Sequence, residues 1–436
     1  MSQSFLHTNV DRGADATPSP DEVSSRLARF ELTRAPSALW PGLSERDRVA
    51  AAREIERVTR GMLAGAHGLC IDPVADFDDY ALAIAAHTTR MGPLLGRWLR
   101  DGSIEAAPAV QLRFKKLLEH SRARHARISR EVSPALDALA SRVPTVVALR
   151  GFHTARSYFD EPGMRRMADV DVLVAPEHID AAEAALRSAG FHPGGDALRP
   201  YKRDWLPPGA APRIFSVEVD DPRNRWSLEL HASLDRIMHP GAVARLDGER
   251  DCIELVELEG RELSVLRQPL LAISLACHCS QELGSSRLLR LYELVRVIRT
   301  DCANGLLDWN ELLAMLERTR AARFAWPAFA LAEDLAPGTV DARVLANGRA
   351  ASTWAARRTV ARLVPAGGSL DESGALRQAM WTRGPVSLLQ RALRNVWPAS
   401  FTRPRDVLPG WRVRLRRIQA GLLSFDAPDE RVIPPR

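Results

Sequence analysis

The chain has 436 residues, of which 46% are hydrophobic and 26% are charged, and it carries a formal net charge of +6. This composition is typical of a soluble globular protein, and the length allows two or three domains with substantial cores. No apolar run approaches the roughly 20 residues of a membrane-spanning helix, so no membrane partner is expected.

The excess positive charge comes almost entirely from arginine, since the only lysines are Lys115, Lys116 and Lys202. Together with abundant alanine, this favours a bias in composition over a role in nucleic-acid binding. A local exception is residues 403–417, where four arginines closely follow Trp411: Arg412, Arg414, Arg416 and Arg417. A solvated basic face of a terminal helix explains that stretch better than a phosphate-binding patch does. Nucleic acid is therefore not expected as a partner.

The N-terminal residues 1–39 are polar and lack the basic-then-apolar layout of a secretory signal, which predicts a flexible tail. The five cysteines are odd in number and scattered along the chain. In a chain of this length they indicate reduced thiols rather than a disulfide framework. These features predict a cytoplasmic protein.

Residues 40–143 have apolar side chains at intervals of three and four, which predicts an N-terminal helical region. Its first helix is expected to begin after Ser44, a plausible N-cap, with Asp47 three residues later in a weak capping-box arrangement.

The periodicity changes to that of short strands and one helix in residues 144–265, which predicts a small α/β domain with a mixed sheet. The helix has Pro176 in its first turn and Gly190 just past its end. A loop rich in proline and glycine is expected over 194–212, and a second helix from about Thr154. The predicted strands are 145–149, 170–175, 214–219 and 226–234.

Helical periodicity returns over residues 266–400, and a basic tail follows in 401–436. The expected fold class is therefore α+β, with a small mixed-sheet domain flanked by N-terminal and C-terminal helical regions.

Two aspartates stand at the start of an otherwise apolar strand, in the sequence RRMADVDVLV (165–174). Because alternate residues of a strand point to the same side, Asp169 and Asp171 should project together, with Val170 and Val172 on the opposite face. Two neighbouring carboxylates repel each other and should raise each other's pKa values. A divalent cation such as Mg²⁺ would resolve that conflict by binding both.

A third carboxylate is available at Glu229 in the strand SLELH, where it shares a face with His231. Three carboxylates on neighbouring strands can hold two metal ions for in-line phosphoryl or nucleotidyl transfer. Phosphates could lie at the turn of Arg150 and Gly151, before a helix N-terminus, with Arg165 and Arg166 adding charge.

The order of these segments resembles the nucleotidyltransferase superfamily related to DNA polymerase β, and more narrowly an uncharacterised bacterial branch of it. The resemblance runs from about Asp76 to Leu331 and rests on the RG turn, RRMADVDVLV, LELH and the segment LACHC…RLLRLYEL (275–294). It implies that residues 144–265 are the nucleotidyltransferase domain. It also implies that Asp169, Asp171 and Glu229 bind metal, with Glu229 helping to activate the acceptor.

The same resemblance implies that the nucleotide phosphates lie against Gly151 and that Arg165 is a functional arginine. The sequence departs from the pattern of the branch at Arg150 (usually Lys), Ala168 (Gly), Ala232 (Trp) and Glu293 (Asp). The superfamily also often has Gly-Gly or Gly-Ser in the phosphate turn, where this chain has Gly-Phe. The carboxylates are thus all present, and the phosphate turn is the altered part.

The histidines and the remaining charges have simpler interpretations. His231 and His278 are assigned at most a supporting role around the metal ligands, because a hydrogen-bonded histidine is more common than a ligand. The sequence CHC (277–279) does not predict zinc, since consecutive helical positions point about 100° apart. Arg165 and Arg166 can also be ordinary surface charges, and Glu229 an ordinary strand residue.

The function predicted from these residues is a Mg²⁺-dependent nucleotidyltransferase, with two metal ions expected and Mn²⁺ as an alternative. It would move an NMP group from an NTP, expected to be ATP, to an unidentified acceptor and release pyrophosphate. A peptide or glycan intermediate of natural-product or polysaccharide biosynthesis is the acceptor suggested by the resemblance. Two other functions stay open: a catalytically silent nucleotide- or partner-binding protein with the same fold, and a nucleotide-sugar glycosyltransferase.

Overall fold

The computed structural model describes residues 44–71, 79–194, 202–210, 222, 224–239, 242–281, 283, 287–366 and 380–381. The predicted tail (1–39), the predicted strand 214–219 and the basic C-terminal stretch (401–436) lie outside the described residues.

The N-terminal part of the chain is helical, as its periodicity predicts. Ser44 caps the first helix, because its Oγ accepts a hydrogen bond from the backbone N–H of Asp47 at 3.0 Å. Two very short parallel strands, β1 (Leu69–Cys70) and β2 (Ile104–Glu105), pair between the helices. The helices are α2 (Glu45–Leu63), α3 (Asp79–Thr88), α4 (Gly92–Arg100) and α5 (Pro108–Ala140).

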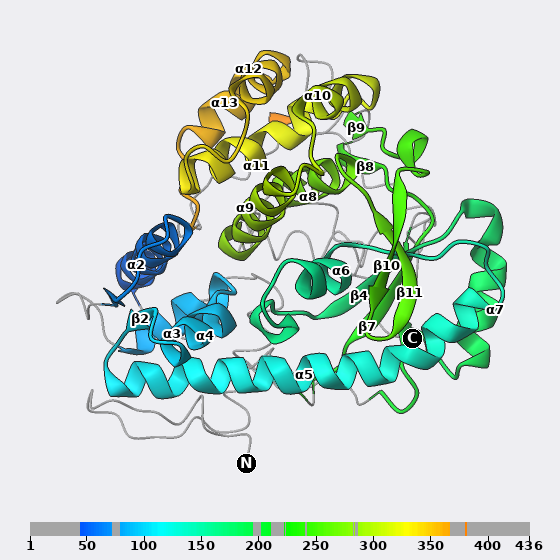
Figure 1. The fold of residues 1–436 in the computed structure, drawn as a ribbon, viewed down its shortest axis with the longest axis horizontal. Coiled ribbons are helices and arrows are strands. Elements are labelled where there is room, and N and C mark those ends of the chain that lie inside the picture. The colour runs from blue at the N-terminus through cyan, green and yellow to red at the C-terminus, as the bar shows by residue number, and fades with distance from the viewer. Residues whose placement is uncertain are drawn as a thin grey trace, which may run out of the picture.

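Helix α5 runs along one side of the molecule and connects the helical part to the sheet (Figure 1). Its N-terminal half packs on α3 and α4, and its C-terminal half packs towards α7. The close crossing of α4 and α5 depends on Gly96, because a Cβ there would overlap the carbonyl of Phe114. A single long helix therefore links the two parts of the fold.

The described residues form one mixed sheet of seven strands, in the order β10-β11-β3-β4-β7-β6-β5. Its central pair, β4 and β7, is parallel, and β3 and β6 flank this pair in antiparallel orientation. The strands are β3 (Val147–Ala148), β4 (Asp169–Leu173), β5 (His192–Pro193), β6 (Lys202–Leu206), β7 (Ser227–His231), β10 (Ile253–Leu258) and β11 (Arg261–Leu266).

The remaining elements lie around this sheet. Helix α6 (Arg150–Ser157) follows β3, and α7 (Ile179–Ser188) follows β4 after one 3-10 turn, Pro176–His178. The small antiparallel pair β8 (Arg236–His239) and β9 (Ala242–Ala244) lies next to α8. The C-terminal helices are α8 (Leu270–Gln281), α9 (Arg287–Ala303), α10 (Trp309–Arg318), α11 (Ala322–Leu335), α12 (Ala342–Ala351) and α13 (Trp354–Val360).

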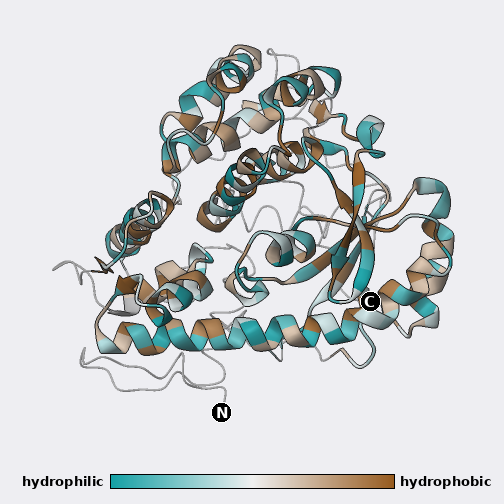
Figure 2. Cartoon of the chain, in the orientation of Figure 1, coloured by the Kyte–Doolittle hydropathy of each residue, from teal (hydrophilic) through white to brown (hydrophobic). Residues whose placement is uncertain are grey.

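Two hydrophobic clusters organise the described residues. One joins the N-terminal helices to α8–α13, so both helical regions share a core. Figure 2 shows α8 as mostly apolar, whereas α5 alternates between apolar and polar residues. The other cluster lies between the sheet, α7 and the C-terminal half of α5. The sheet therefore buries one face in its own core, while the opposite face combines polar side chains with residues of the larger cluster, such as Val147 and Leu173.

The α+β fold with flanking helices is confirmed, two local expectations were wrong, and one hairpin was not predicted. Helix α6 begins at Arg150 instead of about Thr154. The segment predicted as a loop (194–212) contains β6, which pairs with β7. The hairpin β10–β11 extends the sheet beyond β3 and was not predicted. For both strand elements, a pairing between segments of the sheet decides the local structure.

Candidate functional site

The centre of the site is the pair of parallel strands β4 and β7, where Asp171 stands directly opposite Glu229. Val170, Val172 and the two leucines of β7 point to the other face and are fully buried in the cluster beneath the sheet. The alternation predicted for both strands is therefore present. Because the apolar residues fix the orientation of each strand, the carboxylates must share the opposite face.

Asp171 is held by two side chains. Its Oδ1 accepts a hydrogen bond from Arg150 Nη2 at 2.7 Å. His231 Nε2 lies 2.7 Å from the same oxygen and donates to it in the tautomer that carries the proton on Nε2. Burial alone would raise the pKa of Asp171, but Arg150 and His231 outweigh this effect and hold the pKa well below its usual value. The protein groups around Asp171 therefore keep its carboxylate ionised.

Asp169 behaves in the opposite way. Burial, followed by the charges of Glu229 and Asp171, raises its pKa to about 6. We expected each aspartate to raise the pKa of the other, and this is wrong for Asp171, since Arg150 compensates its charge. The site thus contains one firmly ionised aspartate and one that protonates easily.

Glu229 has a partner that the sequence did not indicate. Lys202 of β6 forms a close ion pair with Glu229 Oε1, and its Nζ lies 3.6 Å from Asp204 Oδ1. Lys202 is the direct antiparallel neighbour of His231, so both side chains share the polar face. The positive charge of Lys202 therefore belongs to the same cluster as the carboxylates.

The donor atoms that could share one metal ion are those of Asp171, Glu229 and His231, which lie within 4.8 Å of one another. Two carboxylate oxygens and an imidazole nitrogen are suitable ligands for a divalent ion. Asp169 is outside this group, although its raised pKa shows that it feels both carboxylates. These three donor atoms thus fit a divalent metal ion. His231 lies close enough to the two carboxylates to be a ligand itself, whereas the sequence predicted only a supporting role for it.

The predicted phosphate turn is occupied by protein groups. The guanidinium of Arg165 lies against Gly151 so closely that a Cβ at this position would overlap it. Glu293 of α9, which is 3% exposed, accepts hydrogen bonds from Arg165 Nε at 2.7 Å and Nη2 at 3.0 Å. Thr154 also donates to Glu293. A side chain at position 151 would therefore have to displace the guanidinium of Arg165 from its place beside Glu293.

The unusual backbone of this turn is at Arg150 and not at the glycine. Arg150 has a φ of +36°, which is rare for a residue with a side chain. Its ion pair with Asp171 and the hydrogen bond from Leu149 N–H to the Asp171 carbonyl, at 2.9 Å, hold it in place. Strained residues of this kind concentrate at functional sites.

Two other predicted residues lie further out. Arg166 donates to the carbonyl of His87 at 3.3 Å, at the end of α3. His278 accepts from Arg290 Nη1 at 2.8 Å if its Nε2 is unprotonated. Its pKa is well below the usual value because of burial and then the nearby charges of Arg150 and other arginines. His278 is thus a neutral residue on the α8 side of the turn.

One buried arginine, which sequence reasoning missed, links the entrances of the two central strands. Arg124 of α5 donates to the carbonyls of Met167 (2.8 Å) and Asn224 (2.7 Å), and also to those of Ala168 (3.4 Å) and Arg225 (3.1 Å). The carbonyls of Met167 and Ala168 come just before β4, and those of Asn224 and Arg225 come just before β7. Arg124 therefore fixes the relative positions of Asp171 and Glu229 from below the sheet.

Buried histidines near the turn predict acid sensitivity. Burial lowers the pKa of His125, which contacts the Arg165 carbonyl at 2.5 Å, to about 3, and that of His153 to about 4. In the unfolded chain both titrate near pH 6.5. Below pH 6.5 the unfolded chain therefore binds protons that the fold does not, and the free energy of unfolding should fall with decreasing pH. Each histidine contributes on the order of 1 kcal/mol per pH unit down to its folded pKa.

The measurement is denaturant unfolding of the wild type and of His125→Gln between pH 7 and pH 4. Glutamine can still donate to the Arg165 carbonyl, so the variant should fold and show a shallower dependence on pH. Asp169 has the opposite effect on the free energy of unfolding. Because its pKa is raised, the folded protein binds this proton at a higher pH than the unfolded chain does. The difference between variant and wild type cancels that contribution. Equal pH dependences in the two proteins would contradict the buried, neutral state of His125.

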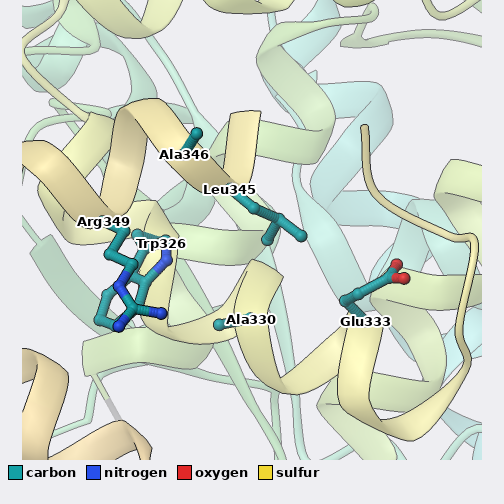
Figure 3. Close-up of a pocket in the computed structure, with 6 residues that line it drawn as sticks. All are labelled: Trp326, Ala330, Glu333, Leu345, Ala346 and Arg349. Carbon is teal, nitrogen blue, oxygen red and sulfur yellow. The ribbon is translucent and has the colours of Figure 1, made fainter. Parts of the chain in front are cut away.

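The described residues also contain a hollow of about 330 Å³ far along the chain, between α11 and α12 (Figure 3). Trp326, Ala330 and Glu333 line it from α11, with Leu345, Ala346 and Arg349 from α12. None of the candidate site residues lies in it. Its lining offers no group of carboxylates, so we do not associate it with the chemistry of the sheet.

The fold and the site together define an α+β protein whose mixed sheet presents acidic side chains, paired with protein cations, on one face. The family model of an uncharacterised nucleotidyltransferase matches residues 75–337, and the chain belongs to this family. This confirms the resemblance to the narrower branch, while the wider relationship to DNA polymerase β stays a prediction. Neither the curated proteins nor the solved structures contain a match. In the described part of the chain, no helix has the length and apolar character to cross a membrane.

Proposed function

We propose that this protein transfers a nucleotidyl group from an NTP to an acceptor oxygen in a reaction that depends on a divalent metal. The observation that carries the proposal is the pairing of Asp171 and Glu229 across two parallel strands, with Asp169 beside them. Family membership supports the reaction class. Mg²⁺ as the ion, ATP as the donor and a peptide or glycan as the acceptor are parts of this proposal.

In the proposed reaction, the acceptor oxygen forms a bond to the α-phosphorus and the bond to the β-phosphate oxygen breaks, so pyrophosphate leaves. Glu229 takes the proton of the acceptor hydroxyl. Asp169, Asp171 and Glu229 hold metal, which neutralises phosphate charge and polarises the reacting oxygens when it is bound. Arg150 and Lys202 lie at the carboxylates and add positive charge for the triphosphate.

The turn at Gly151 and the two arginines after Met164 complete the proposed nucleotide site. Arg165 lies on Gly151, and it can serve the phosphates only if it leaves or shares Glu293. Arg166 is anchored at the end of α3 and would contribute charge from the rim of the site. Because a triphosphate offers several acceptors, it can compete with Glu293 for a guanidinium.

The closed turn favours a second candidate function, a catalytically silent protein that uses this fold to bind a nucleotide or a partner. In that case the ion pair of Arg165 with Glu293 would stay closed. The third function, a nucleotide-sugar glycosyltransferase, needs an extended βαβ unit before the D-x-D motif. The structure has helices α3, α4 and α5 there, which argues against it.

Thermal unfolding with Mg²⁺ and each NTP, together with an assay of NTP turnover, separates the two remaining candidates. A ligand at 100 times its Kd should stabilise the wild type by about 2.7 kcal/mol. The double variant Asp169→Ala/Asp171→Ala should lose this shift if the metal holds the triphosphate. No shift with any NTP would reject the transferase, whereas a shift without turnover would favour the silent protein.

A further inference from the structure

The polar face of the sheet contains one nitrogen donor among its carboxylates. His231 Nε2 lies 2.7 Å from Asp171 Oδ1 and 3.7 Å from Glu229 Oε2. The three side chains are only 4%, 11% and 14% exposed, in the order His231, Asp171 and Glu229. This imidazole nitrogen is therefore at the point where the two carboxylates meet.

The strand pairing fixes the nitrogen in this position. His231 ends β7 between Leu173 of β4 and Lys202 of β6, which are its direct neighbours in the sheet. Its carbonyl accepts from Val174 N–H at 3.0 Å, so the backbone is paired beyond the last residue of β4. The ring cannot turn away without breaking its contact with Asp171.

A metal ion at this place must compete with two protein cations. Arg150 binds the same Asp171 oxygen as His231, and Lys202 binds Glu229. Mg²⁺ derives its binding energy almost entirely from oxygen ligands. Here the negative charge of these oxygens is partly neutralised by Arg150 and Lys202. First-row transition-metal ions, of which Mn²⁺ is the weakest binder, also gain from an imidazole nitrogen. This gain requires the tautomer of His231 that carries its proton on Nδ1, so that Nε2 faces the ion with a lone pair.

We propose that the ion bound by Asp171, Glu229 and His231 is a first-row transition-metal ion such as Mn²⁺, with His231 Nε2 as a direct ligand. The inference rests on the proposed function in one respect: the Mg²⁺ of the proposed reaction would then reach the site bound to the NTP, as a second ion. The site itself binds its metal without a nucleotide.

The test is Mn²⁺ and Mg²⁺ binding to the metal-stripped full chain without nucleotide, measured by calorimetry and by the EPR signal of free Mn²⁺. The wild type should bind Mn²⁺ at least about tenfold more tightly than Mg²⁺, and His231→Gln should lose at least about tenfold in Mn²⁺ affinity with little change for Mg²⁺. His192→Gln, on the exposed strand β5, is the matched control and should bind like the wild type.

A second readout on the wild type alone keeps the test independent of how the variant folds. Pulsed EPR of bound Mn²⁺ should show coupling to one imidazole ¹⁴N nucleus. Equal affinities for the two ions, no nitrogen coupling, or equal losses of Mn²⁺ and Mg²⁺ binding in His231→Gln would each overturn the inference. These results leave the transferase proposal standing, since that proposal fails if no NTP is turned over.

Discussion

Replacing Asp169 by asparagine should reduce NTP turnover by about a thousandfold or more while the protein stays folded. In the proposed reaction this change removes a charge that holds metal. Metal ions contribute several kcal/mol to stabilisation of the transition state, where each 1.36 kcal/mol is worth about tenfold in rate. Asp169 is the best carboxylate for this test, because Asp171 is paired with buried Arg150. Its raised pKa, due first to burial, indicates that a neutral side chain is tolerated there.

The measurement is pyrophosphate release with saturating NTP and metal, together with thermal unfolding. Asp251→Asn is the matched control, because Asp251 is exposed in the turn before β10. The control should turn over like the wild type. If Asp169→Asn kept more than about a tenth of the activity, a loss of less than about 1.4 kcal/mol, Asp169 would not be a metal ligand.

The ion pair between Arg165 and Glu293 should be the most costly contact of the site to break. Both groups are largely buried and bidentate, so Arg165→Met or Glu293→Gln alone should destabilise the fold by about 3–5 kcal/mol through an uncompensated buried charge. The double variant should lose less than the sum of the two changes, because it leaves no unpaired charge.

The matched control is Arg318 with Glu249, which is also bidentate but lies at the surface, with Arg318 52% exposed. The same double-mutant cycle there should give a coupling below about 1 kcal/mol. Denaturant unfolding of all the variants checks both values. A coupling as small at Arg165 as at the surface would mean that the phosphate turn opens freely.

The central strands could be predicted because their signal is local. Alternation in β4 and β7 places Val170 and Leu228 in the core, and this decides the face on which Asp171 and Glu229 lie. The N-cap at Ser44 is local in the same way. Patterns of period two and single capping residues act over a few positions, so one sequence is sufficient to recognise them.

The protein groups that pair with the charges of the site could not be predicted in this way. Lys202 lies in a segment rich in proline and glycine, and it becomes a site residue only when β6 pairs with β7. Glu293 reaches the turn from α9, 128 positions beyond Arg165. Such contacts depend on tertiary packing.

The turn before α6 shows a different kind of limit. The glycine suggested an open phosphate turn, but the structure puts the positive φ at Arg150 and packs Arg165 on Gly151. A glycine motif indicates that another group comes close to the backbone, without identifying that group. Here the group is a guanidinium from the same chain, which a triphosphate would have to share.

The most direct test of nucleotidyl transfer compares the fate of two labels in one reaction. The purified protein is incubated with ATP labelled at the α- or the γ-phosphate, divalent metal and a pool of small molecules and peptides. The account predicts that the α-label appears in a product that depends on Asp169, while the γ-label appears only in pyrophosphate. Transfer of the γ-label to an acceptor, or no consumption of any NTP, would contradict it.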